Sequence, residues 1–130
     1  MRTLYAIGEA LIDFIPNVVN SELKDVTGFT RQVGGAPANV ASTVARLGGQ
    51  AHMITQLGQD AFGDIIVETL QQIGVGTSHI KRTDVANTAL AFVSLKEDGQ
   101  RDFSFYRKPS ADMLYHPDNL EEIDVSSEDI

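Results

Sequence analysis

The sequence predicts an α/β fold, in which a parallel β-sheet is covered by helices and a second, small β-sheet is appended. Apolar strand-like runs alternate with helical patterns over residues 3–74, and strands joined through helices pair in parallel. Residues 88–95 and 101–108 then flank the turn sequence Glu97-Asp98-Gly99, which is typical of a β-hairpin. Because the hairpin breaks the alternation, we expect it to belong to the small sheet.

The first elements are three short strands. Residues 3–7 form an apolar run, and residues 11–15 form a second run that Pro16 stops. Residues 28–33 are also typical of a strand. Only the first of the three is expected to join the parallel sheet.

A helix is predicted over residues 37–47. Val40, Val44 and Leu47 recur at helical spacing. The glycine pair that follows ends the helix, because glycine adopts the left-handed C-terminal conformation at little cost. This segment therefore supplies the first helix that crosses the parallel sheet.

A second strand–helix unit follows directly. Residues 51–57 predict a strand, Asp60 is placed to cap the next helix, and Gly74 to end it. The apolar face of this helix consists of Phe62, Ile65, Ile66, Leu70 and Ile73.

Composition excludes several classes of function. The chain has 130 residues and a net charge of −8, so attraction to a nucleic-acid backbone is a poor expectation and we expect no nucleic-acid partner. It has no cysteine, which excludes disulfides and thiolate chemistry. No apolar run reaches membrane-spanning length, and the N-terminus lacks the pattern of a signal peptide. We therefore expect a cytoplasmic protein without a membrane partner.

The entrance to the first helix is unusual. It reads VGGAPANVA over residues 33–41. Pro37 suits the first helical position, which makes Ala36 the expected N-cap, and alanine caps poorly. A poor cap leaves backbone N–H groups free, and the two glycines let a ligand approach the backbone closely. The amide of Asn39 can both donate and accept, so the segment suits a ligand that bears hydroxyl groups. A tight turn, with Asn39 bonded to its own backbone, is the alternative, and the residues alone leave both open.

This segment resembles the first signature of the ribokinase/fructokinase (PfkB-type) carbohydrate kinases. It reads GGAPANVASTVARLGGQAHMITQLG over residues 34–58, followed by GQDAFG over residues 58–63. Two further segments, GEALIDF at residues 8–14 and FSFYRKPSADML at residues 103–114, are similar to the fructokinase branch in particular. The resemblance implies the N-terminal portion of a ribokinase-like α/β/α sandwich. Its lid would be a small β-sheet with strands near residues 11–15, 28–33, 88–95 and 101–108.

The resemblance also implies site residues. It assigns sugar contacts to Gly34, Gly35 and Asn39, and hydroxyl binding to Asp13. The alternative for Asp13 is an edge strand with its carboxylate in water. On the lid, it favours Arg107 as a substrate or phosphate contact and Phe105 as a residue over the sugar.

One of the lid assignments competes with another role. The exposed aromatic strand around Phe105 equally suits dimer packing, and we expect a homodimer through the lid. Asp60 is expected to be a cap rather than a site residue. His52, His79 and His116 have no metal-ligand spacing, so no metal ligand is assigned.

The implied reaction is ATP-dependent phosphorylation of a sugar hydroxyl, with D-fructose to fructose 6-phosphate the leading expectation. The implied cofactors are ATP and Mg²⁺, with a monovalent cation as a further candidate. The family's catalytic base lies in a GAGD-like segment that these residues lack, so no catalytic residue is assigned here. We expect residues 1–130 to be an N-terminal portion that is inactive alone. The alternatives are 2-keto-3-deoxygluconate, ribose or nucleoside kinases, or a non-catalytic sugar-binding module.

Overall fold

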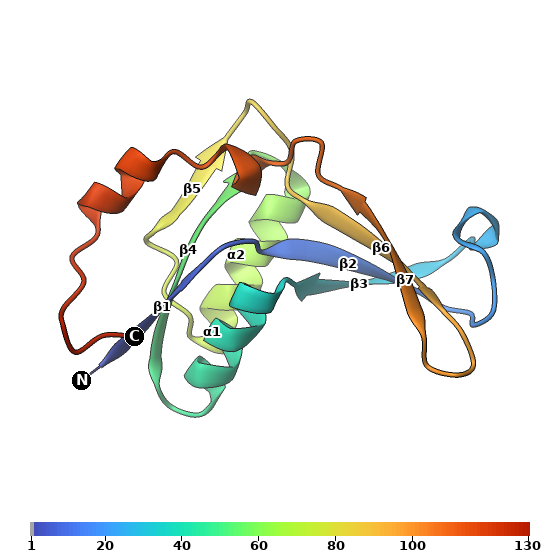
Figure 1. Cartoon of the computed structure of the whole chain (residues 1–130), viewed down its shortest axis with the longest axis horizontal. Coiled ribbons are helices and arrows are strands. Elements are labelled where there is room, and N and C mark those ends of the chain that lie inside the picture. Colours follow the sequence, from blue (N-terminus) through green and yellow to red (C-terminus); the bar gives the residue numbers. More distant parts are fainter. Residues whose placement is uncertain (1) are drawn as a thin grey trace.

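Two β-sheets organise the computed structural model, which describes residues 2–130 (Figure 1). The first sheet is entirely parallel and has the order β1-β4-β5. Its strands are β1 (Thr3–Ile7), β4 (Gln50–Gly58) and β5 (Ile80–Thr83). The predicted parallel sheet is therefore confirmed. Strand β5 was not predicted, because its sequence, IKRT, contains a single apolar residue.

The second sheet has four strands in the order β3-β2-β6-β7. They are β2 (Leu11–Pro16), β3 (Phe29–Gly34), β6 (Leu90–Leu95) and β7 (Arg101–Tyr106). Strands β2 and β6 pair in parallel, whereas β2–β3 and β6–β7 are antiparallel. The predicted hairpin is confirmed as β6–β7, and the sheet projects away from the parallel sheet (Figure 1).

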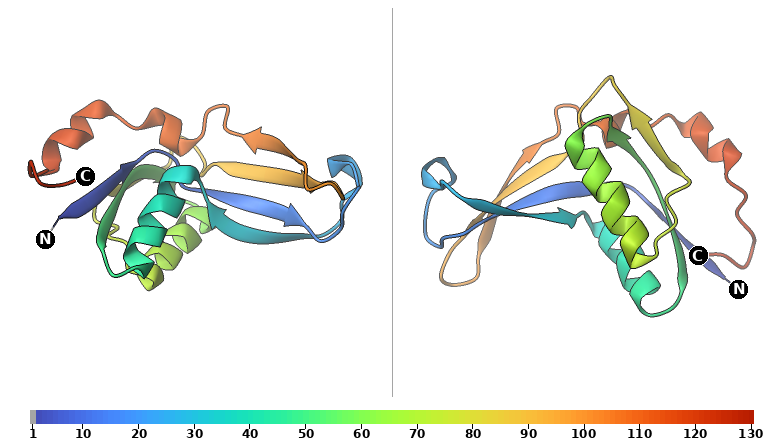
Figure 2. Two further views of the ribbon diagram at one scale, coloured as in Figure 1. Left: turned by 60° about the horizontal axis from the view of Figure 1, so that its bottom comes forward. Right: turned by 180° about the vertical axis from the view of Figure 1, so that it is seen from behind.

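Two helices, α1 (Ala36–Arg46) and α2 (Ala61–Ile73), pack on one face of the parallel sheet (Figure 2). The core between them contains Met53, Leu57, Ile66 and Leu70, none of which is exposed. Burial of such side chains stabilises each by about 1.5–3 kcal/mol relative to full exposure. The predicted apolar face of the second helix is thus confirmed.

The helix ends follow the predicted signals, with one correction. Asp60 caps α2 by accepting from Gly63 N at 2.7 Å, and Gly74 ends it at φ 104°. At α1, however, the N-cap is Gly35 rather than Ala36. Gly35 has a φ of 100°, which alanine adopts only with strain, so the helix begins one residue earlier than predicted.

The C-terminal segment crosses the other face of the parallel sheet (Figure 2). It contains the 3₁₀ turns η2 (Ala111–Leu114) and η3 (Pro117–Glu122); a further one, η1 (Leu23–Asp25), lies in the β2–β3 loop. Gln56 Nε2 donates to Ala111 O at 2.8 Å. At the chain end, Ile130 N donates to Thr3 O at 2.9 Å and Ile130 O accepts from Tyr5 N at 2.7 Å.

Aromatic rings connect the four-stranded sheet to the helices. Phe14 of β2 stacks on Phe92 of β6 at 4.8 Å and meets Phe62 of α2 edge-on at 5.6 Å. Neighbouring residues of a strand point to opposite faces. Asp13 therefore points away from the helices.

No helix among residues 2–130 is both long and apolar enough to cross a membrane.

Candidate functional site

Asp13 lies on a central strand. It is opposite Gln32 of β3 on one side and Ala91 of β6 on the other. The strand of Asp13 is therefore not an edge strand, as the alternative supposed, although the side chain itself is only partly buried. The same row continues from Ala91 to Phe105 of β7. Partners in register share a face of the sheet, and two strand spacings place Asp13 and Phe105 about 10 Å apart.

The Asp13 carboxylate has no hydrogen-bond donor among residues 2–130, although it is partly buried. Burial raises the pKa of Asp13, and the positive charge of Arg101 offsets part of that rise. A partly buried acceptor without a protein partner keeps some contact with water, so it carries only part of the cost of a fully buried one. Such a carboxylate is suited to accept hydrogen bonds from hydroxyl groups of a ligand.

Gly34 and Gly35 form a corner against Asp13 and the preceding loop. A Cβ at Gly34 would collide with the Asp13 carboxylate, with 2.9 Å to its Cγ. A Cβ at Gly35 would lie 2.6 Å from the carbonyl oxygen of Glu9. The two positions therefore exclude side chains for different reasons. Gly34 leaves room for the carboxylate, and Gly35 allows the backbone to turn into α1 beside it.

The N-terminus of α1 has no side-chain cap. Asn39 N donates to Gly35 O at 2.9 Å, which places Asn39 one turn above the corner. Its side chain is exposed and its amide makes no hydrogen bond within residues 2–130. The alternative in which Asn39 bonds to its own backbone is not observed. The helix entrance thus keeps polar groups free at the positive end of the helix dipole.

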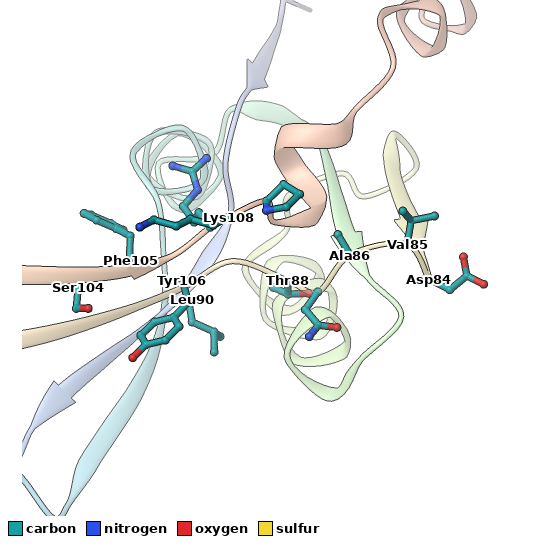
Figure 3. A pocket seen from close by; sticks show the side chains of 12 residues that line it. Asp84, Val85, Ala86, Thr88, Leu90, Ser104, Phe105, Tyr106 and Lys108 are labelled. Carbon is teal, nitrogen blue, oxygen red and sulfur yellow. The ribbon is translucent and has the colours of Figure 1, made fainter. Parts of the chain in front are cut away.

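Phe105 of β7 and Arg107, which directly follows β7, line a separate cleft of about 730 Å³ (Figure 3). Phe105 and Arg107 contribute to it, together with the loop at residues 84–88. In Figure 3 Phe105 and Tyr106 lie on opposite sides of the strand, as alternation predicts. Asp13, Gly34, Gly35 and Asn39 do not line this cleft. The six predicted residues therefore fall into two groups. The corner group is Asp13, Gly34, Gly35 and Asn39, and the cleft group is Phe105 and Arg107. The row from Asp13 through Ala91 to Phe105 connects them.

Arg107 has a partner that the sequence did not reveal. Its Nη2 donates to Asp112 Oδ2 in a close ion pair, and Ser110 Oγ donates to the other carboxylate oxygen. The side chain of Asp112 is 6% exposed, against 30% for Arg107. Opposite charges five residues apart in an irregular segment form no recognisable pattern, so no sequence signal identified this pair.

Asp60 is occupied by structural contacts, as predicted. Its carboxylate accepts from Gly63 N at 2.7 Å, Thr88 N at 2.9 Å and Thr88 Oγ1 at 2.8 Å. Burial raises its pKa. The hydrogen bonds from Thr88 and Gly63, together with the charge of Arg82, outweigh this effect, so that the net pKa of Asp60 is lowered.

The histidines contact aromatic or local groups. His52 stacks on Tyr5 at 5.6 Å and lies 5.6 Å from the ring of His79. His116 Nδ1 accepts from Asp118 N at 3.2 Å. Within the described part of the chain, no three His, Asp or Glu side chains are grouped so that they could hold a metal ion.

The structure is an α/β body with a projecting four-stranded sheet. A carboxylate faces a glycine corner where the body and the sheet meet. These features define a protein of the ribokinase-like class. The structure superposes on fructokinase from Xylella fastidiosa with a TM-score of 0.79 and 45% identity, covering 90% of this chain and 36% of that one. Fructokinase from Halothermothrix orenii also gives a TM-score of 0.79, at 32% identity over 87% of this chain and 40% of that one.

Sequence comparison identifies the family. The profile of the pfkB family carbohydrate kinases matches residues 1–130, and the chain belongs to this family. It is 49% identical to fructokinase from Solanum tuberosum over 117 residues, which are 90% of this chain and 37% of that protein. The chain therefore spans little more than a third of the length of the curated relatives it matches.

Proposed function

We propose that the protein containing this chain transfers a phosphoryl group from ATP to a hydroxyl group of a sugar, with D-fructose as acceptor and fructose 6-phosphate as product. The observation that carries the proposal is the Asp13 carboxylate, which is partly buried, has no donor, and faces the Gly34-Gly35 corner. A sugar hydroxyl would supply the missing hydrogen bonds.

The corner group would bind and orient the sugar. Asp13 would accept hydrogen bonds from hydroxyl groups, Gly34 and Gly35 would let the sugar approach the backbone, and the amide of Asn39 would donate and accept. Phosphoryl transfer depends chiefly on positioning and on stabilisation of charge. These residues would therefore act by holding one hydroxyl in the geometry needed for attack.

The four-stranded sheet would serve as a lid. Phe105 lies in the same row as Asp13 and would shield the sugar from water, which otherwise competes as acceptor. Arg107 would contact sugar or phosphate oxygens, since its fork of N–H donors suits paired oxygen atoms.

ATP and Mg²⁺ would be bound mainly by parts of the protein outside these residues, as would any monovalent cation. One similar structure, 45% identical, is a Xylella fastidiosa fructokinase with bound ATP. The described residues offer no cluster of carboxylates that could hold a metal ion. The residues that bind Mg²⁺ would therefore lie elsewhere in the protein. We propose that residues 1–130 alone do not turn over ATP.

The choice of fructose rests on the similarity of the lid sequence, FSFYRKPSADML, to fructokinases and on relatives that carry this name. The potato relative is 49% identical and a tomato relative, fructokinase-2, is 48% identical. Because one fold hosts many acceptors, the runners-up are 2-keto-3-deoxygluconate, ribose and nucleosides. A sugar-binding module without catalysis is the alternative from another class.

An ADP-release assay on the intact protein tests the proposal. D-fructose, ribose, 2-keto-3-deoxygluconate, fructose 6-phosphate and adenosine are each offered with Mg-ATP. We expect a preference for fructose that Asp13→Ala and Asn39→Ala abolish. Asn119→Ala, at a partly exposed position on η3, should have no effect. Preference for another acceptor would overturn the fructose assignment. Sugar binding without turnover would favour the binding module.

We further propose that two copies associate through the lid. Phe103 and Phe105 stack at 5.6 Å, and each side chain is about half exposed, at 50% and 52%. Adjacent exposed rings on an edge strand are typical of an association surface. Sedimentation of the intact protein should give a dimer that Phe103→Asp dissociates; a dimer unaffected by this change would exclude the lid as its interface.

A further inference from the structure

We propose that Asp112 is a positioning residue that fixes the guanidinium group of Arg107 at the cleft beside β7. This inference rests on the proposed function, because Arg107 is the residue expected to contact sugar or phosphate oxygens. It adds a residue that lies outside the glycine corner, and that acts on the ligand only through Arg107.

The ion pair differs from the others on the molecule by its burial. The Asp112 side chain is 6% exposed, whereas the carboxylates of the other Lys or Arg pairs within residues 2–130 are at least 60% exposed. Exposed pairs contribute little to stability and hold their partners loosely. A carboxylate withdrawn from water holds a guanidinium in one place, and removing it leaves the arginine side chain without its partner.

The carboxylate is itself held in place. Ser110 Oγ donates to the Asp112 oxygen that Arg107 leaves free, and both Ser110 and Ala111 are buried, at 2% and 0% exposure. Ala111 N donates to Asn87 O at 2.8 Å, and Ala111 O accepts from Gln56 Nε2 at 2.8 Å. Asp112 is therefore fixed to the loop at residues 84–88 and to β4.

The pair thus joins two parts of the structure. Arg107 directly follows β7 of the four-stranded sheet, while Asp112 belongs to η2, which is bound to the parallel sheet. A guanidinium has five N–H donors, and Asp112 engages Nη2. Its Nε is buried and has no partner within residues 2–130. Because the Arg107 side chain as a whole is still 30% exposed and lines the cleft, its accessible donors, rather than the buried Nε, remain for a ligand that brings oxygen atoms there.

A purely structural role for the pair, as a staple between β7 and η2, predicts a different outcome from a positioning role. A staple would lower stability when it is cut but would leave the dependence of rate on sugar concentration unchanged. A positioning residue would change the KM for sugar, and its effect would disappear once Arg107 is absent.

The test is a double-mutant cycle in the intact protein, read by ADP release at varied sugar concentration. We expect Asp112→Asn to lower kcat/KM by about 10- to 100-fold, mainly through KM, since a hydrogen bond to a charged group is lost. Arg107→Ala should cause a similar loss, and the double variant should lose little more than Arg107→Ala alone. Asp118→Asn, in the exposed pair with His116, is the matched control and should behave as wild type.

Stability is measured on the same variants, so that a folding defect is separated from a binding defect. An additive cycle, or an unchanged KM with a lowered Tm, would overturn the positioning role while leaving the proposed function intact. If the wild-type protein phosphorylates no acceptor, the proposed function itself fails, and the positioning role at a sugar site fails with it.

Discussion

Replacement of Asp13 by asparagine should stabilise the protein while it removes sugar binding. The carboxylate is partly buried and has no hydrogen-bond donor within residues 2–130, and burial raises its pKa despite the nearby Arg101. Asparagine has nearly the same shape but no charge to withdraw from water. The change therefore relieves a cost in the folded state and leaves the packing around Gly34 in place.

The magnitude follows from the degree of burial. An unpaired polar group costs about 1–3 kcal/mol when fully buried. Partial exposure and the charge of Arg101 reduce this, so that the gain from Asp13→Asn should be about 1 kcal/mol. For the intact protein, of which this chain is expected to be about a third, that corresponds to a rise in Tm of about 1–3 °C.

The pH dependence has a definite sign. A carboxyl group with a raised pKa in the folded state is less stable there in its ionised form. Its destabilising contribution is absent below the pKa of the unfolded chain and is complete above the pKa of the folded state. The stability difference between Asp13→Asn and wild type should therefore be smallest at low pH and grow as the pH rises through the raised pKa of Asp13.

Thermal unfolding of both proteins from pH 3 to pH 8, paired with sugar titration at neutral pH, checks this prediction. The control is Asp60→Asn, where the sign reverses because the pKa of Asp60 is lowered. A lower Tm for Asp13→Asn at neutral pH would show that the carboxylate has a stabilising partner. Retained sugar binding would show that Asp13 is not a ligand contact. Either result would contradict this prediction.

Three further outcomes are expected. Gly34→Ala should displace the Asp13 carboxylate and reduce sugar affinity at least tenfold, as measured by titration with sugar. The control is Gly48→Ala, where a Cβ has open space but φ is 88°. It should lower the Tm measured by calorimetry without affecting sugar binding. Asp60→Asn should cost about 1–3 kcal/mol at neutral pH in denaturant unfolding, and less as acid protonates Asp60. Phe105→Ala should increase ATP hydrolysis relative to sugar phosphorylation, measured as ADP released without sugar phosphate; an unchanged ratio would argue against shielding.

Elements set by local signals were predictable from the sequence. The cap at Asp60 and the stop at Gly74 depend on residues within one helical turn, and both were found where expected. The hairpin likewise depends on a turn between two adjacent runs. Each of these features is stabilised by neighbours along the chain, so that the sequence pattern carries the necessary information.

Features set by distant contacts were not predictable in this way. Strand β5 has one apolar residue and forms because β4 offers it an edge. Helix α1 starts one residue earlier than predicted because Gly35, which lies against the Glu9 carbonyl, serves as its N-cap with a positive φ. Ala36 can then adopt the ordinary helical conformation. In both cases the deciding neighbour lies elsewhere in the sequence, and local propensity is overridden.

The candidate site combines both kinds of information. The glycine corner was visible because Gly34, Gly35 and Asn39 lie within six residues of each other. The row from Asp13 to Phe105 exists only because β2 pairs in parallel with β6, a pairing between segments far apart in the chain. Retaining an unpartnered carboxylate in such a row costs stability. That cost is consistent with selection for ligand binding at this position rather than for the fold, because asparagine or a small apolar residue would satisfy the sheet equally well.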